Sequence, residues 1–222
     1  MRKRKWILPL IIGVVALGIV VGIFVFKPNN NNGIYEHISE IREVVYKAEI
    51  DGNKMTAISG EREVNYAVDG KCNGTADFLI ITVEGKFVKS PEYCVEIDGS
   101  EYAGTMQKHP FNDEYSCEIN ARVKADEFDV KIKVDNDEKT VKLHSIVTSS
   151  FITAQDALEK SRNILSIDAN EFDGEIYVRL IENPLKSDDT YYWYVAYYFQ
   201  NDDCKSVLFD ALSGEAVAVK ND

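Results

Sequence analysis

The side chains best suited to molecular recognition gather near the C-terminus, in the aromatic segment "TYYWYVAYYFQ" and in "GEIYVRLIEN" before it. If both segments are strands, alternate residues point to opposite faces. One face then holds Tyr177, Arg179, Tyr192, Tyr194 and Tyr198. Tyrosine and arginine concentrate in binding hot spots because they offer large contact areas, and tyrosine is also stiff. We therefore predict that this face contacts a protein or peptide.

A structural reading of the same residues stays open. Tyrosine is a favourable strand residue and cross-strand partner, and the face could pack on the preceding part of the chain instead. The opposite face is expected to be the core of this region. Its predicted members are Ile176, Val178, Leu180, Trp193, Val195, Tyr197, Phe199, Val207, Phe209, Val217 and Val219.

Catalytic and metal-binding patterns are not found in the sequence. His37, His109 and His144 lie in separate segments without ligand spacing, so we predict that they are solvated. The acidic clusters "VDNDEKTV" and "LKSDDTYY" fit hairpin turns better than a calcium loop. No Gly-x-Ser-x-Gly, His-Glu-x-x-His or glycine-rich phosphate motif occurs. The sequence therefore predicts no enzyme activity, no catalytic residue, no metal and no cofactor.

Four cysteines, Cys72, Cys94, Cys117 and Cys204, are spread along the chain. None forms a Cys-x-x-Cys pair, which argues against a metal or redox site. Two disulfides in any of three pairings, or free thiols, all remain open.

Charge limits the class of partner. The 222 residues carry a net charge of −12. Residues 1–27 hold five basic side chains and no acid, which leaves 20 basic against 37 acidic residues, or −17, in the rest. Such an acidic body repels phosphate backbones, so we expect no nucleic-acid partner.

Residues 6–26 form an uncharged apolar run of 21 residues, long enough to cross the roughly 30 Å hydrocarbon layer at about 1.5 Å per residue. It is longer than the apolar part of a signal peptide, and basic residues precede it. We predict a cytoplasmic tail at residues 1–5, a transmembrane anchor at 6–26 and a polar linker at 27–33. The protein is then a single-pass cell-membrane protein with extracytoplasmic domains. Gly18 and Gly22 form a Gly-x-x-x-Gly pair that could support a homodimer.

Residues 34–149 are predicted to form a seven-stranded β-sandwich. Ile34, Ile38, Ile41 and Val45 have helical spacing, so a short helix is expected before the first strand. From about residue 61 to 147, seven alternating segments are separated by turn signals. The pattern resembles an immunoglobulin-like or fibronectin type III-like sandwich, and "DEYSC" echoes the immunoglobulin Asp-x-Tyr-x-Cys motif. The region lacks a tryptophan, so only the architecture is transferred.

Residues 150–222 are predicted to be a separate α+β domain. Thr153 and Asp156 form a capping-box pattern at the start of an amphipathic helix, and four strands follow. The segments "TAQDALEKS", "WYVAYY" and "VLFDALSGEAV" resemble the PepSY domain family. This resemblance implies one helix packed on a four-stranded antiparallel sheet, and a role in restraining or assisting extracytoplasmic peptidases.

The predicted fold class is thus mainly β, with an α+β C-terminal domain and an N-terminal membrane helix. The predicted function is a non-catalytic binding protein that contacts or regulates an envelope protein or peptidase. One alternative is a structural or signalling envelope component that dimerises through its membrane helix. Another is a carbohydrate-binding module or an unrecognised hydrolase, which would need an exposed aromatic groove; the alternation of Tyr93 and Tyr102 predicts core positions instead.

Overall fold

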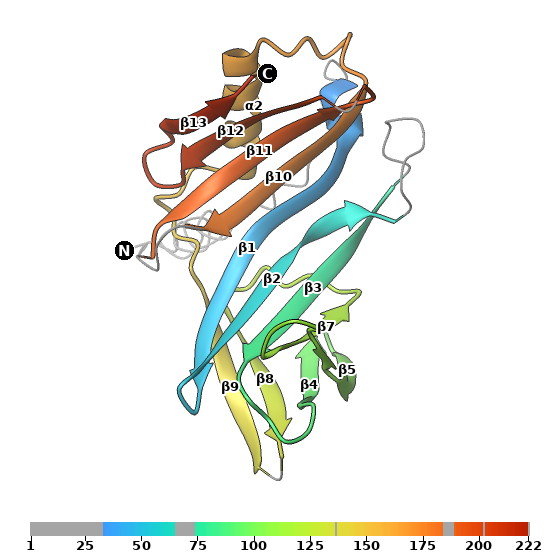
Figure 1. Ribbon diagram of the computed structural model, residues 1–222, viewed down its shortest axis with the longest axis vertical. Helices are drawn as coiled ribbons and strands as arrows, with labels where there is room; N and C mark the ends of the chain where they lie inside the picture. Colours follow the sequence, from blue (N-terminus) through green and yellow to red (C-terminus); the bar gives the residue numbers. More distant parts are fainter. Residues whose placement is uncertain (1–32, 65–73, 136, 184–188, 202, 222) are drawn as a thin grey trace, which may run out of the picture. The chain divides into compact units, whose positions relative to one another are not determined.

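A computed structural model describes residues 33–64, 74–135, 137–183, 189–201 and 203–221. Within these residues the fold is mostly β (Figure 1). The strands are β1 (Ile38–Ile50), β2 (Asn53–Glu63), β3 (Thr75–Glu84), β4 (Glu92–Ile97), β5 (Ser100–Thr105), β6 (Gln107–Lys108), β7 (Glu114–Ile119), β8 (Glu127–Val134), β9 (Asp137–Ser145), β10 (Gly174–Glu182), β11 (Tyr191–Phe199), β12 (Cys204–Asp210) and β13 (Ala216–Lys220). The helices in these described ranges are a 3-10 turn, η1 (Gly33–His37), and an α-helix, α2 (Ala154–Leu165).

The long strand β1 is shared by both halves of the sheet (Figure 1). Along one edge it pairs with β2 in antiparallel register, from Glu40 opposite Arg62 to Ile50 opposite Asn53. Its other edge pairs first with β10, in parallel, and then with β9 at Tyr46. The sheet therefore forks at β1, and the thirteen strands in the described part of the chain belong to one hydrogen-bonded network.

One half of the fold is a nearly closed ring of strands. From β1 the ring runs one way through β2, β3 and β7, and the other way through β9, β8 and β4. The chain from β5 to β6 links the two arms, because β5 pairs with β4 and β6 pairs with β7. Inside lies a core that includes Tyr46, whose hydroxyl donates to the carbonyl oxygens of Val123 and Ala125 at 3.0 Å each.

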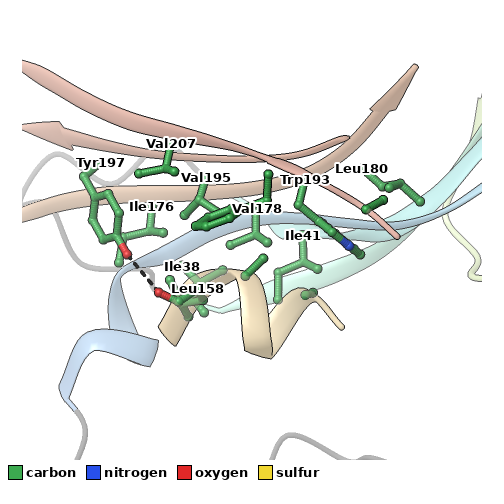
Figure 2. Close-up of a cluster of buried hydrophobic side chains, with 14 of the residues drawn as sticks. Ile38, Ile41, Leu158, Ile176, Val178, Leu180, Trp193, Val195, Tyr197 and Val207 are labelled. Atoms are coloured by element: carbon green, nitrogen blue, oxygen red, sulfur yellow. Dashed lines mark hydrogen bonds between the residues drawn. The ribbon is translucent and has the colours of Figure 1, made fainter. Parts of the chain in front are cut away.

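The other half packs α2 against β10, β11 and β12, with the start of β1 (Figure 2). The capping box predicted at Thr153 is confirmed, since Thr153 Oγ1 accepts from the Asp156 amide at 3.0 Å and Asp156 accepts from the Thr153 amide at 3.1 Å. Leu158 on α2 meets the buried face of the strands in Figure 2. The hydroxyl groups of Tyr197 and Ser161 form a 2.7 Å hydrogen bond.

The predicted core face in this half is confirmed for Trp193, Val195 and Tyr197, but it is wrong for the last strand. Val217 and Val219 on β13 are exposed. The cause is geometric, because α2 packs over β10 to β12 and does not extend over β13.

The predicted fold class is wrong. The four C-terminal strands do not form a sheet of their own, because β10 pairs with β1 from Ile38 to Arg42, more than 130 residues earlier. Nor do the preceding strands form a separate sandwich; they surround the ring core and share β1 with the C-terminal strands. The self-contained α+β domain implied by the PepSY resemblance is thus not what the structure shows. The boundary predicted at residue 149 falls between β9 and α2 and stays a prediction.

The predicted transmembrane anchor, residues 6–26 with Gly18 and Gly22, lies outside the described residues. Within the described ranges, no helix has both the length and the apolar character needed to cross a membrane. The finding contradicts a membrane-spanning helix within the described fold, and the described residues do not support the predicted single-pass membrane protein with extracytoplasmic domains.

Candidate binding surface

The predicted binding residues lie together on one face of β10 and β11. Antiparallel register places Arg179 opposite Tyr194, and Tyr194 opposite Leu208 on β12. The intervening residues, such as Trp193 and Val195, are buried against α2. Alternation therefore turns Tyr177, Arg179, Tyr192, Tyr194, Tyr198 and Leu208 away from the helix. We call these six residues the tyrosine face.

Aromatic contacts hold the centre of the tyrosine face in place. The rings of Tyr177 and Tyr198 meet edge to face, with centroids 5.4 Å apart. Ala196 lies opposite Tyr177 in the register and is fully buried. The two large rings thus cover the small side chain of Ala196. Tyr177 itself is half-buried, and Tyr198 is 43% exposed.

Arg179 is fixed from two sides. Its guanidinium carbon lies 4.6 Å from the centroid of the Tyr177 ring, a cation–π contact. Its Nε and Nη2 donate to the two carboxylate oxygens of Glu40 at 3.0 and 3.1 Å. Glu40 also accepts from Arg42, so a single nearly buried carboxylate holds two guanidinium groups. Such two-pronged pairs fix orientation as well as adding energy.

Glu40 and Arg42 are neighbours of the tyrosine face that the sequence did not reveal. Both residues lie more than 130 positions before β10, and the first residues of their strand, β1, have helical spacing in the sequence. The parallel pairing places Glu40 next to Tyr177 and Arg42 next to Arg179. The alternation of apolar and polar residues in "ISEIREVVYK" would indicate that Glu40 and Arg42 point outward. It would not indicate which strand pairs with theirs.

The hydroxyl groups of Tyr177 and Tyr198 are uncharged at neutral pH. Burial raises the pKa of Tyr198 to about 12, helped by the neighbouring Tyr194 and Cys204. Burial, together with the hydrogen bond that the Tyr177 hydroxyl donates to Glu175 at 2.6 Å, also raises the pKa of Tyr177. Both groups therefore stay protonated and can act as hydrogen-bond donors.

Tyr191, at the start of β11, belongs to a separate ionic cluster. Lys47 Nζ lies 5.0 Å from the Tyr191 ring centroid and donates to Glu182 at 2.9 Å and to Asp189 at 3.1 Å. Burial favours a neutral Lys47, but the hydrogen bonds to Tyr191, Glu182 and Asp189 outweigh it, so the pKa of Lys47 is raised. This cluster links the end of β10 to β1.

No group of three or more His, Cys, Asp or Glu side chains that could hold a metal ion occurs among the described residues. The predicted solvation of the histidines is wrong for His37, which is buried and within 2.8 Å of the Gly174 carbonyl oxygen. Cys94, Cys117 and Cys204 are free thiols. Burial raises the pKa of Cys117 to about 12, so it is a poor nucleophile. Cys72, like Gly18 and Gly22, lies outside the described residues.

One open cleft of about 450 Å³ lies where β1 and β9 separate. Its lining residues are Ala48, Glu49, Ile50, Asp51, Lys139, Thr140, Val141, Lys142 and His144. Lys139 is paired with Asp51 at 2.5 Å, and Lys142 is paired with Glu127 at 2.7 Å. Because both lysines are already paired with carboxylates, they contribute little to binding a charged ligand in the cleft, and we do not assign a function to it.

Comparison with family models, with curated proteins and with solved structures gives no match. The PepSY resemblance of residues 150–222, and the peptidase partner that it implies, therefore stay predictions.

Proposed function

We propose that this protein is a non-catalytic binding protein and that the tyrosine face takes up another protein or a peptide. The observation that carries the proposal is the fixed Tyr198–Tyr177–Arg179–Glu40 arrangement, in which each group is held by the next at 5.4 Å, 4.6 Å and 3.0 Å. Side chains that are already ordered lose little conformational entropy when a partner covers them, so binding to such a surface has a low entropic cost.

A polypeptide partner fits this face better than the other classes considered. The net charge of −12 disfavours nucleic acid. A carbohydrate-binding module would need an exposed aromatic groove in the first half of the chain, but Tyr93 and Tyr102 pack against the ring core there. Uncharged tyrosine hydroxyls and one clamped arginine offer hydrogen bonds and apolar contact together, as polypeptide recognition requires.

Replacing Tyr194 and Tyr198 by alanine tests the proposal. Peptides are selected from a random display library on the full-length protein, and their affinities are measured by fluorescence anisotropy. We expect the Tyr194→Ala/Tyr198→Ala variant to bind the selected peptides at least about 10-fold more weakly, because two anchoring rings are removed. Both residues lie outside the α2 core, so the circular dichroism spectrum should not change.

Phe111→Ala provides the matched control, since Phe111 is an exposed aromatic residue in the other half of the fold. It should bind the selected peptides as the wild type does. Equal binding to wild type and the double variant would contradict the proposal, and so would a library from which no peptide is enriched.

A further inference from the structure

The last strand, β13, has an open edge. It ends the order β13-β12-β11-β10-β1 and pairs with β12 alone among the described strands. Figure 1 shows it at the outer edge of this half of the sheet. An unpaired edge presents main-chain N–H and C=O groups that another strand can use.

The side chains of β13 are unusual for a strand without a partner. All five are exposed, and Val217 and Val219 are 52% and 51% accessible. Val219 lies opposite the buried Val207, so it points to the same face of the sheet as α2. Lys160 on α2 reaches the Gly214 carbonyl oxygen in the turn before β13 at 2.9 Å, but the helix does not cover the strand itself. An apolar strip therefore runs along an open edge.

We propose that β13 pairs with β13 of a second copy of this chain, in antiparallel register about a two-fold axis. Charge is the first argument for this occupant. The chain has a net charge of −12, yet residues 216–220 contain no acidic side chain and one basic one. Two copies of an acidic protein repel each other over most of their surfaces. The β13 strands themselves add no carboxylate to that repulsion.

The sequence of β13 is also complementary to itself. With the two-fold axis at Ala218, antiparallel pairing places Val217 of one copy opposite Val219 of the other and Lys220 opposite Ala216. Branched apolar pairs stabilise neighbouring strands, and no like charges face each other. The sheets of the two copies then become continuous, with one α2 helix on either side of the shared valines.

This pairing makes a weak dimer. Five residues form the strand, and the β12–β13 register shifts between Leu208 and Phe209, which interrupts its regularity. Short and irregular edges limit association, and the contact is smaller than a standard stable interface. We expect association that rises with protein concentration.

Sedimentation velocity of the full-length chain over a range of concentrations tests the proposal. The Val217→Lys/Val219→Lys variant adds four like charges across the paired strands and should weaken dimerisation at least about 10-fold. The matched control is Val64→Lys/Val88→Lys, which changes two exposed valines in the other half of the fold and should associate as the wild type does. Residues 1–32 are present in every variant, so any association through them cancels in the comparison.

Hydrogen exchange at residues 216–220 identifies the strand itself. In the wild type, exchange of amides in β13 should slow as concentration rises, and in the lysine variant it should not change. A wild-type protein that stays monomeric would overturn the proposal. The strand that pairs with the β13 edge would then have to come from another protein. Equal association of all three proteins, or exchange at β13 that is independent of concentration, would also overturn it. The result does not depend on the tyrosine face, which lies on the opposite side of the sheet.

Discussion

Glu40 connects the tyrosine face to the rest of the fold. Its carboxylate accepts two hydrogen bonds from Arg179 and one from Arg42, although it is itself nearly buried. A buried carboxylate is stable in its charged form only when its partners compensate for lost water. The two guanidinium groups provide this compensation, and in return Arg179 is held against the Tyr177 ring.

At the residue scale, we predict that Glu40→Gln lowers the free energy of unfolding by about 2 kcal/mol, because it removes a charge-assisted acceptor from two arginines. Urea denaturation measures the change. Glu138→Gln, in the exposed turn region at the start of β9, is the control and should be nearly neutral. An equal effect of the two substitutions would show that the Glu40 pairs add no stability.

At the scale of elements, β1 bends where it changes partner. Its pairing with β2 is irregular between Arg42 and Val44, next to the point where β10 gives way to β9. Gly60 on β2 lies opposite Arg42, and a Cβ atom there would come within 2.0 Å of the Ile41 carbonyl oxygen. The close approach of the two backbones at this bulge requires glycine.

We therefore predict that Gly60→Ala destabilises the protein by about 3 kcal/mol or more, since only a backbone shift could relieve the contact. Gly33→Ala is the control, because a Cβ at Gly33 has no neighbour closer than 3.8 Å. Thermal denaturation of both variants should separate them clearly. A Gly60→Ala variant as stable as Gly33→Ala would mean that β1 and β2 can move apart at the bulge without cost.

At the scale of the whole molecule, the two cores depend on one strand. Ile38, Ile41 and Val45 of β1 contribute to the α2 core, and Tyr46 and Ile50 contribute to the ring core. The Lys47–Glu182 pair links β1 with the end of β10. If β1 unfolds, both halves lose a strand of their sheet, so the two halves should unfold together.

We predict a single unfolding transition. Tryptophan fluorescence, measured in a Trp6→Phe background so that it follows Trp193 in the α2 core, and far-ultraviolet circular dichroism, which follows the whole sheet, should report it at the same denaturant concentration. Leu158→Ala in the α2 core and Leu143→Ala in the ring core should each lower the stability seen by both probes, by about 2 to 5 kcal/mol. Two transitions, each shifted by only one of the variants, would instead indicate two independent domains.

Much of the local structure could be predicted from the sequence. Alternation identified most of the strands, the capping pair Thr153 and Asp156 located the start of α2, and one face of β10 and β11 was predicted to hold Tyr177, Arg179 and Tyr194. These signals depend on residues within a few positions of one another, so they can be read from the sequence without knowledge of the fold.

The tertiary structure decided which strands are neighbours. The β1–β10 pairing merges two predicted domains into one sheet, brings Glu40 to Arg179 and buries His37 beside Gly174. The length of α2 and its position leave Val217 and Val219 uncovered. Alternation gives the side of a strand but not its neighbour, because pairing between distant segments depends on the free energy of the whole packed chain.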